Sequence, residues 1–453
     1  MDFVDPSDAL FNIPELLPHE NIYQIQVGSK LFKVSGASLS SDGPSFFTDY
    51  FNSQEDKDAS HVLTIDRSDL VFETIMAHLQ GYPLSVLDEK EFITLFLDSL
   101  YYRLPRLKRM LQKYDYHFIN IGGKHFKFSI SVFDRPGDSP NYFNVLIDSM
   151  LVEVENLFRD KKMIRPPSHF IPFVTRSSEL FQEILNLLTD DDYVVPDHIS
   201  ISNLLKECKF YCLLNLQQRL LPNKITSNPF CKREEITMKL QHLRRTGIKL
   251  LTQNAADMKA CEIRSDSESE ESSFCPNKKQ KLTSPAEWDM ISYQRPYVDK
   301  NPRDLIVQID SGDLTLYFNK RMKTIHVNIA NPSICSMLRS LFIDIKKKNN
   351  IQESHFEYPN FRGYVFLTCV IMADLTINGL PCKNVCSKID EIKTNEQIYD
   401  FSNGDGMMPG LRLYVVGPSL WRLGVKDQHI IMLPLKLNCI TNLRQFNKHL
   451  EFV

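Results

Sequence analysis

An internal repeat in the first half of the chain limits its fold more than any other feature of the sequence. Residues 28–35 read Gly-Ser-Lys-Leu-Phe-Lys-Val-Ser and return 94 residues later, at 122–129, as Gly-Gly-Lys-His-Phe-Lys-Phe-Ser, with five of eight positions identical. Two further blocks recur in the same order, one displaced by 96 residues and the other by 109. They pair Pro44, Phe46 and Phe47 with Pro140, Tyr142 and Phe143, and Arg67, Ser68, Phe72, Ile75 and Leu79 with Arg176, Ser177, Phe181, Ile184 and Leu188. Three blocks in register predict two copies of one structural unit.

Each copy is predicted to be a small sheet clasped by helices. Short strands at 23–27 and 118–121 lead into a glycine turn and a second strand, and tight hairpin turns require the positive φ that glycine tolerates. The apolar residues that follow are spaced by three and four, as on one face of a helix. Further leucines indicate two more helices in each copy, and Pro105 is expected in the first turn of the last helix of the first copy. This order of elements predicts an α+β fold.

The residues around the turn resemble a known family. The run 119–126, Ile-Asn-Ile-Gly-Gly-Lys-His-Phe, is similar to the opening strand-turn-strand of BTB/POZ domains of the potassium-channel tetramerisation type. In the first copy, 63–67 (Leu-Thr-Ile-Asp-Arg) and 78–82 (His-Leu-Gln-Gly-Tyr) resemble the middle of that domain, particularly in fungal soluble members, whereas 187–191 departs from the pattern in the second copy. The hairpin motif consists of Gly28, Lys30, Phe32, Gly122, Gly123, Lys124 and Phe126.

The resemblance covers residues 23–112 and 117–222, which are expected to be two tandem BTB/POZ-like domains after an N-terminal tail, 1–22. It implies non-catalytic association modules that form dimers or rings and often bring substrates to cullin ubiquitin ligases. Self-association through these domains is therefore expected, a cullin is a possible partner, and the two copies could also pair within one chain. A purely structural role for both copies is the alternative, because a fold does not dictate function.

Composition and charge point to a folded protein of the nucleus or cytoplasm. The net charge of −3, from 53 Lys+Arg and 56 Asp+Glu, gives no overall electrostatic reason to bind nucleic acid or acidic lipid. The first residues lack the basic start of a secretory or transit sequence, and no apolar run reaches the roughly 18 residues of a membrane span. The ten cysteines all follow residue 207 and do not form a disulfide framework. We expect no membrane association and no direct nucleic-acid binding.

Residues 223–294 are predicted to contain a basic helix followed by a flexible acidic, serine-rich linker. Ile236, Leu240 and Leu243 sit at helical spacing among lysines and arginines, which indicates an amphipathic helix that packs on the second repeat or, alternatively, binds a membrane or partner. The run 265–273 is too polar to bury a core. An acidic residue lies three positions after Ser265 and three positions after Ser267, which favours phosphorylation of both serines. The proline directly after Ser284 favours phosphorylation of that serine.

A short basic cluster follows the acidic run. Lys278, Lys279 and Lys281 fit the Lys-Lys-any-Lys form of a nuclear import signal, although a solvated charge run gives the same pattern. Phosphates of about −2 charge nearby would alter the field at these lysines. The hypothesis is import that phosphorylation tunes.

Residues 295–453 are predicted to form a mixed, mainly β domain that resembles no family we recognise. Apolar strands at 305–309 and 314–318 flank a polar turn, which predicts a hairpin. Pro332 is expected to begin a helix that ends at Lys346–Lys348, where cations favour the negative helix terminus. Further buried strands are expected within 364–377, 411–416 and 430–440.

The sequence contains no recognised catalytic or metal-binding motif. Cys208 and Cys212, like Cys382 and Cys386, are four residues apart with no flanking histidine, so core packing is favoured over zinc. The glycines of 404–410 are spaced unlike a nucleotide-binding loop and favour a hairpin connection. A lone histidine such as His125 favours a core or interface role over that of a base.

The sequence thus predicts a non-enzymatic protein-protein interaction scaffold with no catalytic residue, cofactor or metal. Its leading form is a substrate adaptor for a cullin ligase. The alternative is a nuclear scaffold in transcription or chromatin regulation. An enzyme would need its site within 295–453.

Overall fold

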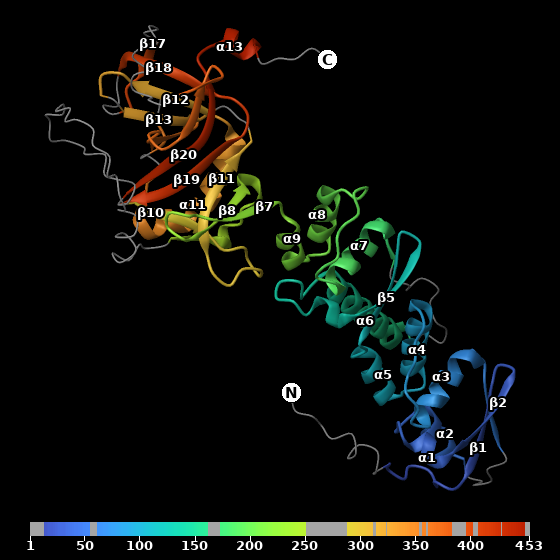
Figure 1. The fold of residues 1–453 in the computed structure, drawn as a ribbon. Coiled ribbons are helices and arrows are strands. Elements are labelled where there is room, and N and C mark those ends of the chain that lie inside the picture. The colour runs from blue at the N-terminus through green and yellow to red at the C-terminus, as the bar shows by residue number, and fades with distance from the viewer. Residues whose placement is uncertain are drawn as a thin grey trace. The chain divides into compact units, whose positions relative to one another are not determined.

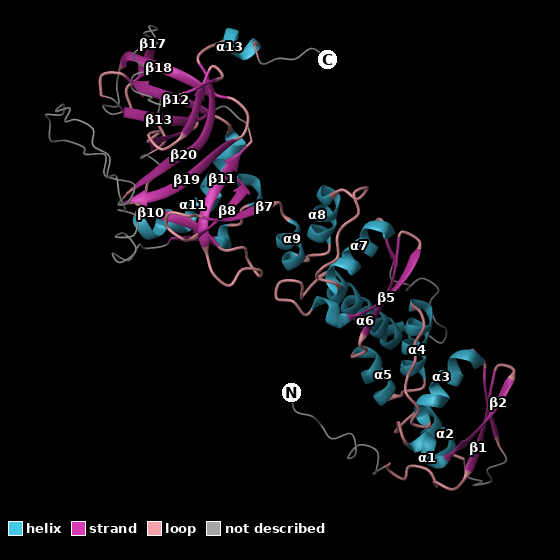
Figure 2. Cartoon of the chain, viewed as in Figure 1, coloured by secondary structure: helices cyan, strands magenta, loops and turns pink. Residues whose placement is uncertain are grey.

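The computed structural model describes residues 13–54, 61–161, 173–250, 288–310, 314–322, 324–352, 356–358, 361–382, 396–401, 406–426 and 428–448. The chain divides into two compact units, the head, Met1–Gln217, and the C-terminal unit, Gln218–Val453. Helices predominate in the head and strands in the C-terminal unit (Figure 1, Figure 2). The predicted order of two mixed helix-and-sheet repeats followed by a mainly β domain is confirmed.

Repeat 1 is a three-stranded sheet covered by helices. It consists of β1 (Ile22–Val27), β2 (Lys30–Ser35), α1 (Gly36–Ser40), α2 (Phe46–Asn52), β3 (Val62–Ile65), α3 (Asp69–Leu79), α4 (Glu89–Tyr101) and α5 (Pro105–Gln112). The central strand β1 pairs antiparallel with β2 and parallel with β3. Alternation along β1 buries Tyr23, Ile25 and Val27 on one face. Helix α5 begins at Pro105, as the sequence predicts.

Repeat 2 has the same order of elements and the same sheet. It consists of β4 (Tyr116–Ile121), β5 (Lys124–Ser129), the 3₁₀ turn η1 (Ile130–Phe133), α6 (Tyr142–Lys161), β6 (Phe173–Val174), α7 (Ser178–Thr189), α8 (Ile201–Phe210) and α9 (Leu214–Leu220). The strand order β5-β4-β6 reproduces β2-β1-β3. The largest difference in length is in α6, which has 20 residues where its counterpart α2 has 7.

The two repeats share a stacked arginine. In repeat 1 the guanidinium of Arg67 lies 3.8 Å from the centroid of the Tyr101 ring and pairs with the buried Asp98. In repeat 2 the guanidinium of Arg176 lies 3.9 Å from the Phe210 centroid, and Glu207 pairs with it at 3.5 Å. All three positions are displaced by 109 residues, so the third sequence block corresponds to one packing arrangement.

A buried aspartate joins the start of the last helix to the rest of repeat 1. The Asp42 carboxylate accepts hydrogen bonds from the backbone N–H groups of Arg106 (2.6 Å) and Leu107 (2.8 Å) in α5, and from His78 Nε2 (2.8 Å) in α3. Burial raises the pKa of Asp42, but the bond from His78 and the two backbone bonds outweigh it and hold that pKa below its usual value.

Repeat 2 keeps the aspartate but not the histidine. Asp138 accepts from the backbone N–H groups of Asn215 (3.0 Å) and Leu216 (3.1 Å), while the position of His78 is occupied by Leu187. Asp138 Oδ2 is buried and has no hydrogen-bond partner among the described residues. Burial therefore raises the pKa of Asp138, and the backbone bonds offset this only in part. Folding therefore favours the anionic form of the aspartate in repeat 1 and disfavours the anionic form of the aspartate in repeat 2.

The C-terminal unit is built on a 14-stranded sheet with one long helix against it. Its elements are β7 (Asn223–Ser227), β8 (Glu234–Lys239), η2 (Leu240–His242), η3 (Arg245–Gly247), β9 (Ile248–Leu250), β10 (Asp289–Tyr293), β11 (Arg303–Ile309), β12 (Leu314–Asn319), β13 (Thr324–Ile329), α11 (Pro332–Asn349), β14 (Tyr364–Thr368), β15 (Asp374–Ile377), β16 (Leu380–Pro381), β17 (Glu396–Tyr399), β18 (Met407–Val415), β19 (Ser419–Lys426), β20 (His429–Ile440) and α13 (Leu443–Asn447).

Part of this sheet returns on itself. Strand β18 pairs with β12 on one side and with the end of β20 on the other, and β13 and β14 complete the path between them. These strands therefore form a closed ring, which leaves fewer unpaired edges than an open sheet. Helix α11 begins at Pro332 and ends with Lys346, Lys347 and Lys348 in its last turn, as predicted.

The predicted basic helix around Ile236 is wrong. Residues 234–239 form β8, which pairs in parallel with β11, and short 3₁₀ turns and β9 follow. Ile236, Met238 and Leu240 are buried in alternation, and a spacing of four residues satisfies the strand period as well as the helical one. Long-range pairing with β11 favours the strand over the helix, so this basic segment belongs to the C-terminal sheet.

The predicted hairpin between 305–309 and 314–318 is also wrong. Both segments are strands, β11 and β12, but β11 pairs with β8, β10 and β19, whereas β12 pairs with β13 and β18. Every residue of β12 is buried, so strands far away in sequence can compete for its edges with the adjacent one. The short connection joins two different parts of the sheet.

We expect Asp42→Asn to destabilise the head by about 2–3 kcal/mol, since it loses the charge-assisted bond with His78. The matched substitution Asp138→Asn should change stability by less than about 1 kcal/mol, because Asn retains an acceptor oxygen and removes a strained anion. During urea unfolding of the full chain, two spectroscopic signals report on the two units separately. Far-UV circular dichroism follows the helical head, while both tryptophans, Trp288 and Trp421, report on the C-terminal unit.

The contributions of Asp42 and Asp138 to the free energy of unfolding should depend on pH with opposite signs. The Asp42 contribution is present above the usual pKa of aspartate and is lost as the pH falls through its lowered folded-state pKa. The Asp138 contribution runs the other way, being lost as the pH rises from the usual pKa to the raised one. Equal losses from the two asparagine variants at neutral pH would contradict this account.

Candidate functional site

The hairpin motif that the sequence singled out forms the same turn in both repeats. Gly28 and Gly122 have φ of +52° and +57°, and a Cβ on Gly122 would lie only 2.4 Å from the carbonyl oxygen of Arg176. The turn thus packs directly on the segment that leads into α7. Glycine is required there by both its conformation and this close approach.

The other motif residues hold the hairpin to the helix beneath it. Phe32 and Phe126 are buried in edge-to-face contacts with Phe72 and Phe181, with centroids 4.9 Å apart in each pair. Lys30 pairs with Glu73 in repeat 1, and Lys124 Nζ donates to Gln182 Oε1 at 3.1 Å in repeat 2. Gly123 has φ of +89° with open space around it. The motif builds the domain, and its described contacts are all within its own repeat.

The two repeats of the head meet at a largely apolar contact, which we call the joint. Phe92 of α4 stacks on Phe118 of β4 with centroids 5.5 Å apart, and Tyr114 packs 5.9 Å from Phe118. Phe92 is 5% exposed and Phe118 2% exposed. The apolar face of α6 belongs to the same core cluster, through Ile147, Met150, Leu151 and Val154. One hydrophobic core therefore continues from repeat 1 into repeat 2.

Polar contacts frame this apolar centre. The buried carboxylate of Glu89 contacts His125 Nδ1, and Lys127 Nζ donates to the carbonyl oxygen of Val86 at 2.7 Å. Lys108 Nζ of α5 pairs with Glu155 of α6 at 2.7 Å. Such directional bonds fix the orientation of the two faces, whereas the aromatic contacts supply most of the burial. His125 is an interface residue, in agreement with its sequence interpretation.

The joint pairs one kind of face from repeat 1 with a different kind of face from repeat 2. The equivalent faces, one on each repeat, therefore take no part in the joint. Repeat 1 uses its α4 side and repeat 2 uses the outer face of its sheet. The corresponding sheet face of repeat 1, the open sheet face, exposes Ile22, Leu31 and Val62 at 49%, 44% and 43%. They lie on one side of the sheet, because Gln24 pairs with Val62 and Lys33, and Gln26 pairs with Leu31.

Repeat 2 leaves the opposite face uncovered. On α8 the residue equivalent to Phe92 is Ile201, which is exposed, and the nearby Val194 is 82% exposed. We call Val194, Val195, His198 and Ile201 the open helix face. Sequence reasoning named the hairpin turns but missed the joint. Its only sequence signal is divergence between equivalent positions: Phe118 corresponds to Gln24, and Phe92 to Ile201.

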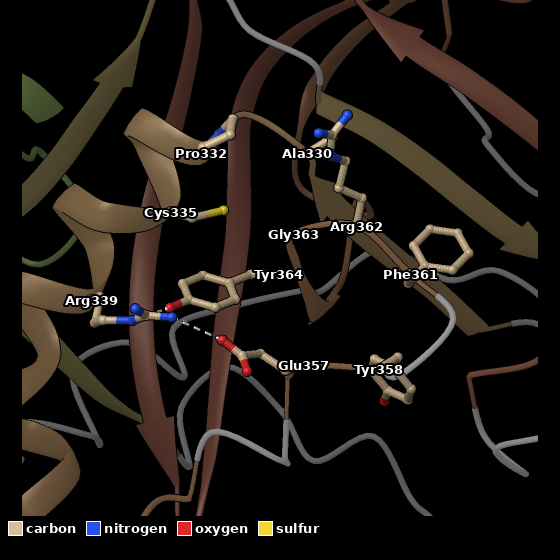
Figure 3. Close-up of a pocket in the computed structure, with 10 residues that line it drawn as sticks. All are labelled: Ala330, Pro332, Cys335, Arg339, Glu357, Tyr358, Phe361, Arg362, Gly363 and Tyr364. Carbon is tan, nitrogen blue, oxygen red and sulfur yellow. Dashed lines mark hydrogen bonds and ion pairs between the residues drawn. The ribbon is translucent and has the colours of Figure 1, made fainter.

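A second feature is a pocket of about 560 Å³ in the C-terminal unit, between the first half of α11 and the segment 357–364 (Figure 3). Arg339 Nε donates to the Tyr364 hydroxyl at 2.8 Å, and Arg339 Nη2 donates to Glu357 Oε1 at 3.1 Å. Tyr358, Phe361 and Arg362 complete the wall opposite the helix. The pocket combines aromatic surface with cationic groups.

Other predicted site residues have mixed outcomes. Ser265, Ser267, Ser284, Lys278, Lys279 and Lys281 lie outside the described residues, as does Cys386. Cys208 is buried as predicted, but Cys212 is exposed, because it follows α8 with φ of +60° and turns away from the core. The described part of the glycine-rich run, 406–410, includes the start of β18, which pairs antiparallel with β17 as the hairpin interpretation requires. No group of three metal-ligating side chains occurs in the described part of the chain. Of the helices described, none is both long and apolar enough to cross a bilayer.

Comparison with known proteins agrees with this architecture. A family model described as BTB/POZ domain matches residues 23–111 and 118–220, and another, described as the YLR108C C-terminal domain, matches 233–450. The chain belongs to the BTB/POZ domain family, in its potassium-channel tetramerisation type, with two tandem copies.

Two yeast proteins are similar over nearly the whole chain. It is 38% identical to the Saccharomyces cerevisiae protein YDR132C over 100% of this chain and 98% of that protein. It is 32% identical to the Saccharomyces cerevisiae BTB/POZ domain-containing protein YLR108C over 97% of this chain and 96% of that protein. BTB/POZ domains are typically interaction modules and not enzymes, and they commonly self-associate.

Substitution Phe92→Ala should destabilise the head by about 3 kcal/mol, because it empties the aromatic centre of the joint. The equivalent change in repeat 2, Ile201→Ala, should cost less than about 1 kcal/mol, since that side chain is exposed. Far-UV circular dichroism during urea unfolding of the full chain measures both. A similar loss from the two variants would show that the aromatic contact does not hold the repeats together.

Proposed function

We propose that this protein is a non-enzymatic scaffold whose head associates with a second copy of itself and whose C-terminal unit engages a client. The observation that carries the proposal is the asymmetric joint. A contact between two different faces leaves one free face at each end, so a further copy can add by the same kind of contact. Such heterologous contacts build a ring when the rotation from one copy to the next closes on the first copy. Two chains would supply four repeats, joined by two internal joints and two contacts between chains.

The open faces retain part of the chemistry of the joint. Lys33 corresponds to Lys127 and would donate to the carbonyl of Val195, which corresponds to Val86. Leu31 and Val62 offer apolar surface to Ile201. Gln24 in place of Phe118 removes the aromatic stack, so the contact between chains should be weaker than the joint. We therefore expect reversible association that depends on protein concentration.

Leu31→Glu should shift the full-length protein towards the monomer, because it places an unpaired anion in the contact between chains. Light scattering coupled to size-exclusion chromatography over a concentration series gives the mass. Leu70→Glu, on the exposed side of α3, is the matched control and should leave the wild-type mass distribution unchanged. A wild-type protein that stays monomeric throughout, or an unaltered distribution for Leu31→Glu, would refute the proposed interface.

The family relationship supports a more specific role for this scaffold, that of an adaptor in a cullin ubiquitin ligase. In that role the head would bind the cullin and the C-terminal unit the substrate. The basic cluster at 278–281 supports instead a scaffold that works in the nucleus, in transcription or chromatin regulation. We propose that the protein occupies both nucleus and cytoplasm and that Ser265, Ser267 and Ser284 are phosphorylated to set the balance.

Replacing Lys278, Lys279 and Lys281 with Ala should reduce the nuclear fraction of a fluorescently tagged full chain, since an import receptor needs the clustered charge. Replacement of Lys346, Lys347 and Lys348, a basic run on α11, is the control and should leave localisation unchanged. Affinity capture from the same cells distinguishes the two roles, because the adaptor retains a cullin in both variants. Unchanged nuclear signal in the first variant would reject the import signal.

A further inference from the structure

We infer that the pocket beside α11 binds an acidic peptide segment, and that its occupant is this chain's own acidic run, residues 265–273. The inference concerns the C-terminal unit and does not depend on self-association of the head. It assigns the pocket a ligand and gives the phosphorylation candidates a physical consequence.

The pocket is preformed on its aromatic side. The ring of Phe361 packs against those of Tyr317 and Phe401, with centroids 5.4 and 4.9 Å away, and Tyr358 packs 5.2 Å from Phe401. Tyr358 and Phe361 are nevertheless only half-buried, so each offers an outer surface to a ligand. Its volume of about 560 Å³ falls in the usual range of ligand sites, roughly 300–1,000 Å³.

The charge of the pocket is positive and only partly compensated. Arg339 is already bonded to Tyr364 and Glu357 and is thereby held in place. Arg362 is exposed and forms no ion pair with any described residue. In Figure 3 Arg339 and Arg362 come from the two walls of the pocket, the helix and the facing segment. The described lining contains two guanidinium groups and one carboxylate, and Arg362 has no ion-pair partner among the described residues. This arrangement favours an anionic ligand, because guanidinium binds carboxylate or phosphate in a bidentate manner.

The chain carries a complementary segment within reach. Residues 265–273 contain Asp266, Glu268, Glu270 and Glu271. Residues 251–287 connect β9 to β10, and these two strands pair with each other at Leu250 and Ile291. Ser265 is 15 residues from Leu250, a stretch that spans up to about 50 Å when extended.

The connection that contains the acidic run begins after β9, close to helix α11, which forms one wall of the pocket. Arg245, just before β9, binds Asp344 of α11 through two bonds, one of them 2.7 Å from Nε to Oδ2. Cys335, in the pocket wall, precedes Asp344 on the same helix by nine residues, or about 14 Å along its axis. A tethered ligand at such distances has a millimolar effective concentration, so modest affinity is enough for occupancy. Phosphates on Ser265 and Ser267 would each add about −2 charge and strengthen it.

The test uses a labelled synthetic peptide of residues 262–275 and measures its binding by fluorescence anisotropy. The receptor is the full chain with Asp266, Glu268, Glu270 and Glu271 replaced by Asn or Gln, which removes the internal competitor. We expect binding that weakens about tenfold or more in Arg362→Glu, since a favourable pairing becomes a repulsion. Arg444→Glu, the same charge reversal in α13 outside the pocket, should stay within about twofold. Peptide phosphorylated at Ser265 and Ser267 should bind about tenfold more tightly.

Two further arms locate the site and its natural occupant. The unaltered chain should bind the peptide more weakly than the neutralised chain, because its own acidic run competes. Equal binding by the two would overturn the internal occupant, and equal loss in Arg362→Glu and Arg444→Glu would overturn the pocket. Tryptophan fluorescence confirms that the variants remain folded. If Arg362→Glu is unfolded, Arg362→Gln replaces it, and full retention of binding by Arg362→Gln would also overturn the proposal.

Discussion

The stacking of Phe92 on Phe118 is the contact on which the architecture of the head depends. Each repeat by itself is a three-stranded sheet with short helices, a size at which burial of apolar surface barely offsets chain entropy. The joint extends one hydrophobic core across both repeats, with the long helix α6 as its second wall. Glu89, Lys127 and their partners then fix the relative orientation of the two sheets. The tandem arrangement is therefore a source of stability for both repeats.

The two copies have diverged in the way they satisfy the same buried groups. Both keep the stacked arginine and the aspartate that receives the N–H groups of the last helix. Only repeat 1 supplies a histidine to that aspartate, so the pKa of Asp42 falls while that of Asp138 rises. Divergence is also clear at the surface, where Phe118 corresponds to Gln24. One face forms an internal contact, and its counterpart, which has Gln24 in place of Phe118, leaves Ile22, Leu31 and Val62 exposed.

The C-terminal unit has a different construction and a different kind of surface. Strands of its closed ring contribute Tyr317 and Val365 to the aromatic cluster around Phe401, and the pocket beside α11 lies at the edge of that cluster. Ring-to-ring contacts position Tyr358 and Phe361 before any ligand arrives, which lowers the entropic cost of binding. The head leaves apolar residues exposed on one sheet face and one helix face. The C-terminal unit offers an aromatic and cationic concavity suited to a short anionic segment.

The sequence by itself determined the features that depend on local periodicity and on comparison of one copy with the other. The glycine turns, the helices at steps of three and four, Pro105 and Pro332 at helix starts, and the family all followed from residues close together in the chain. The tertiary structure alone decided which partner each strand took. Ile236 and Met238 lie in a strand because β11 pairs with them, and β11 and β12 part because distant strands occupy their edges. The joint likewise needed the folded head, because Phe92 and Ile201 occupy equivalent positions in the two repeats, yet Phe92 is buried against Phe118 and Ile201 is exposed. Burial and strand pairing are properties of contacts between residues far apart in sequence, and no local pattern encodes them.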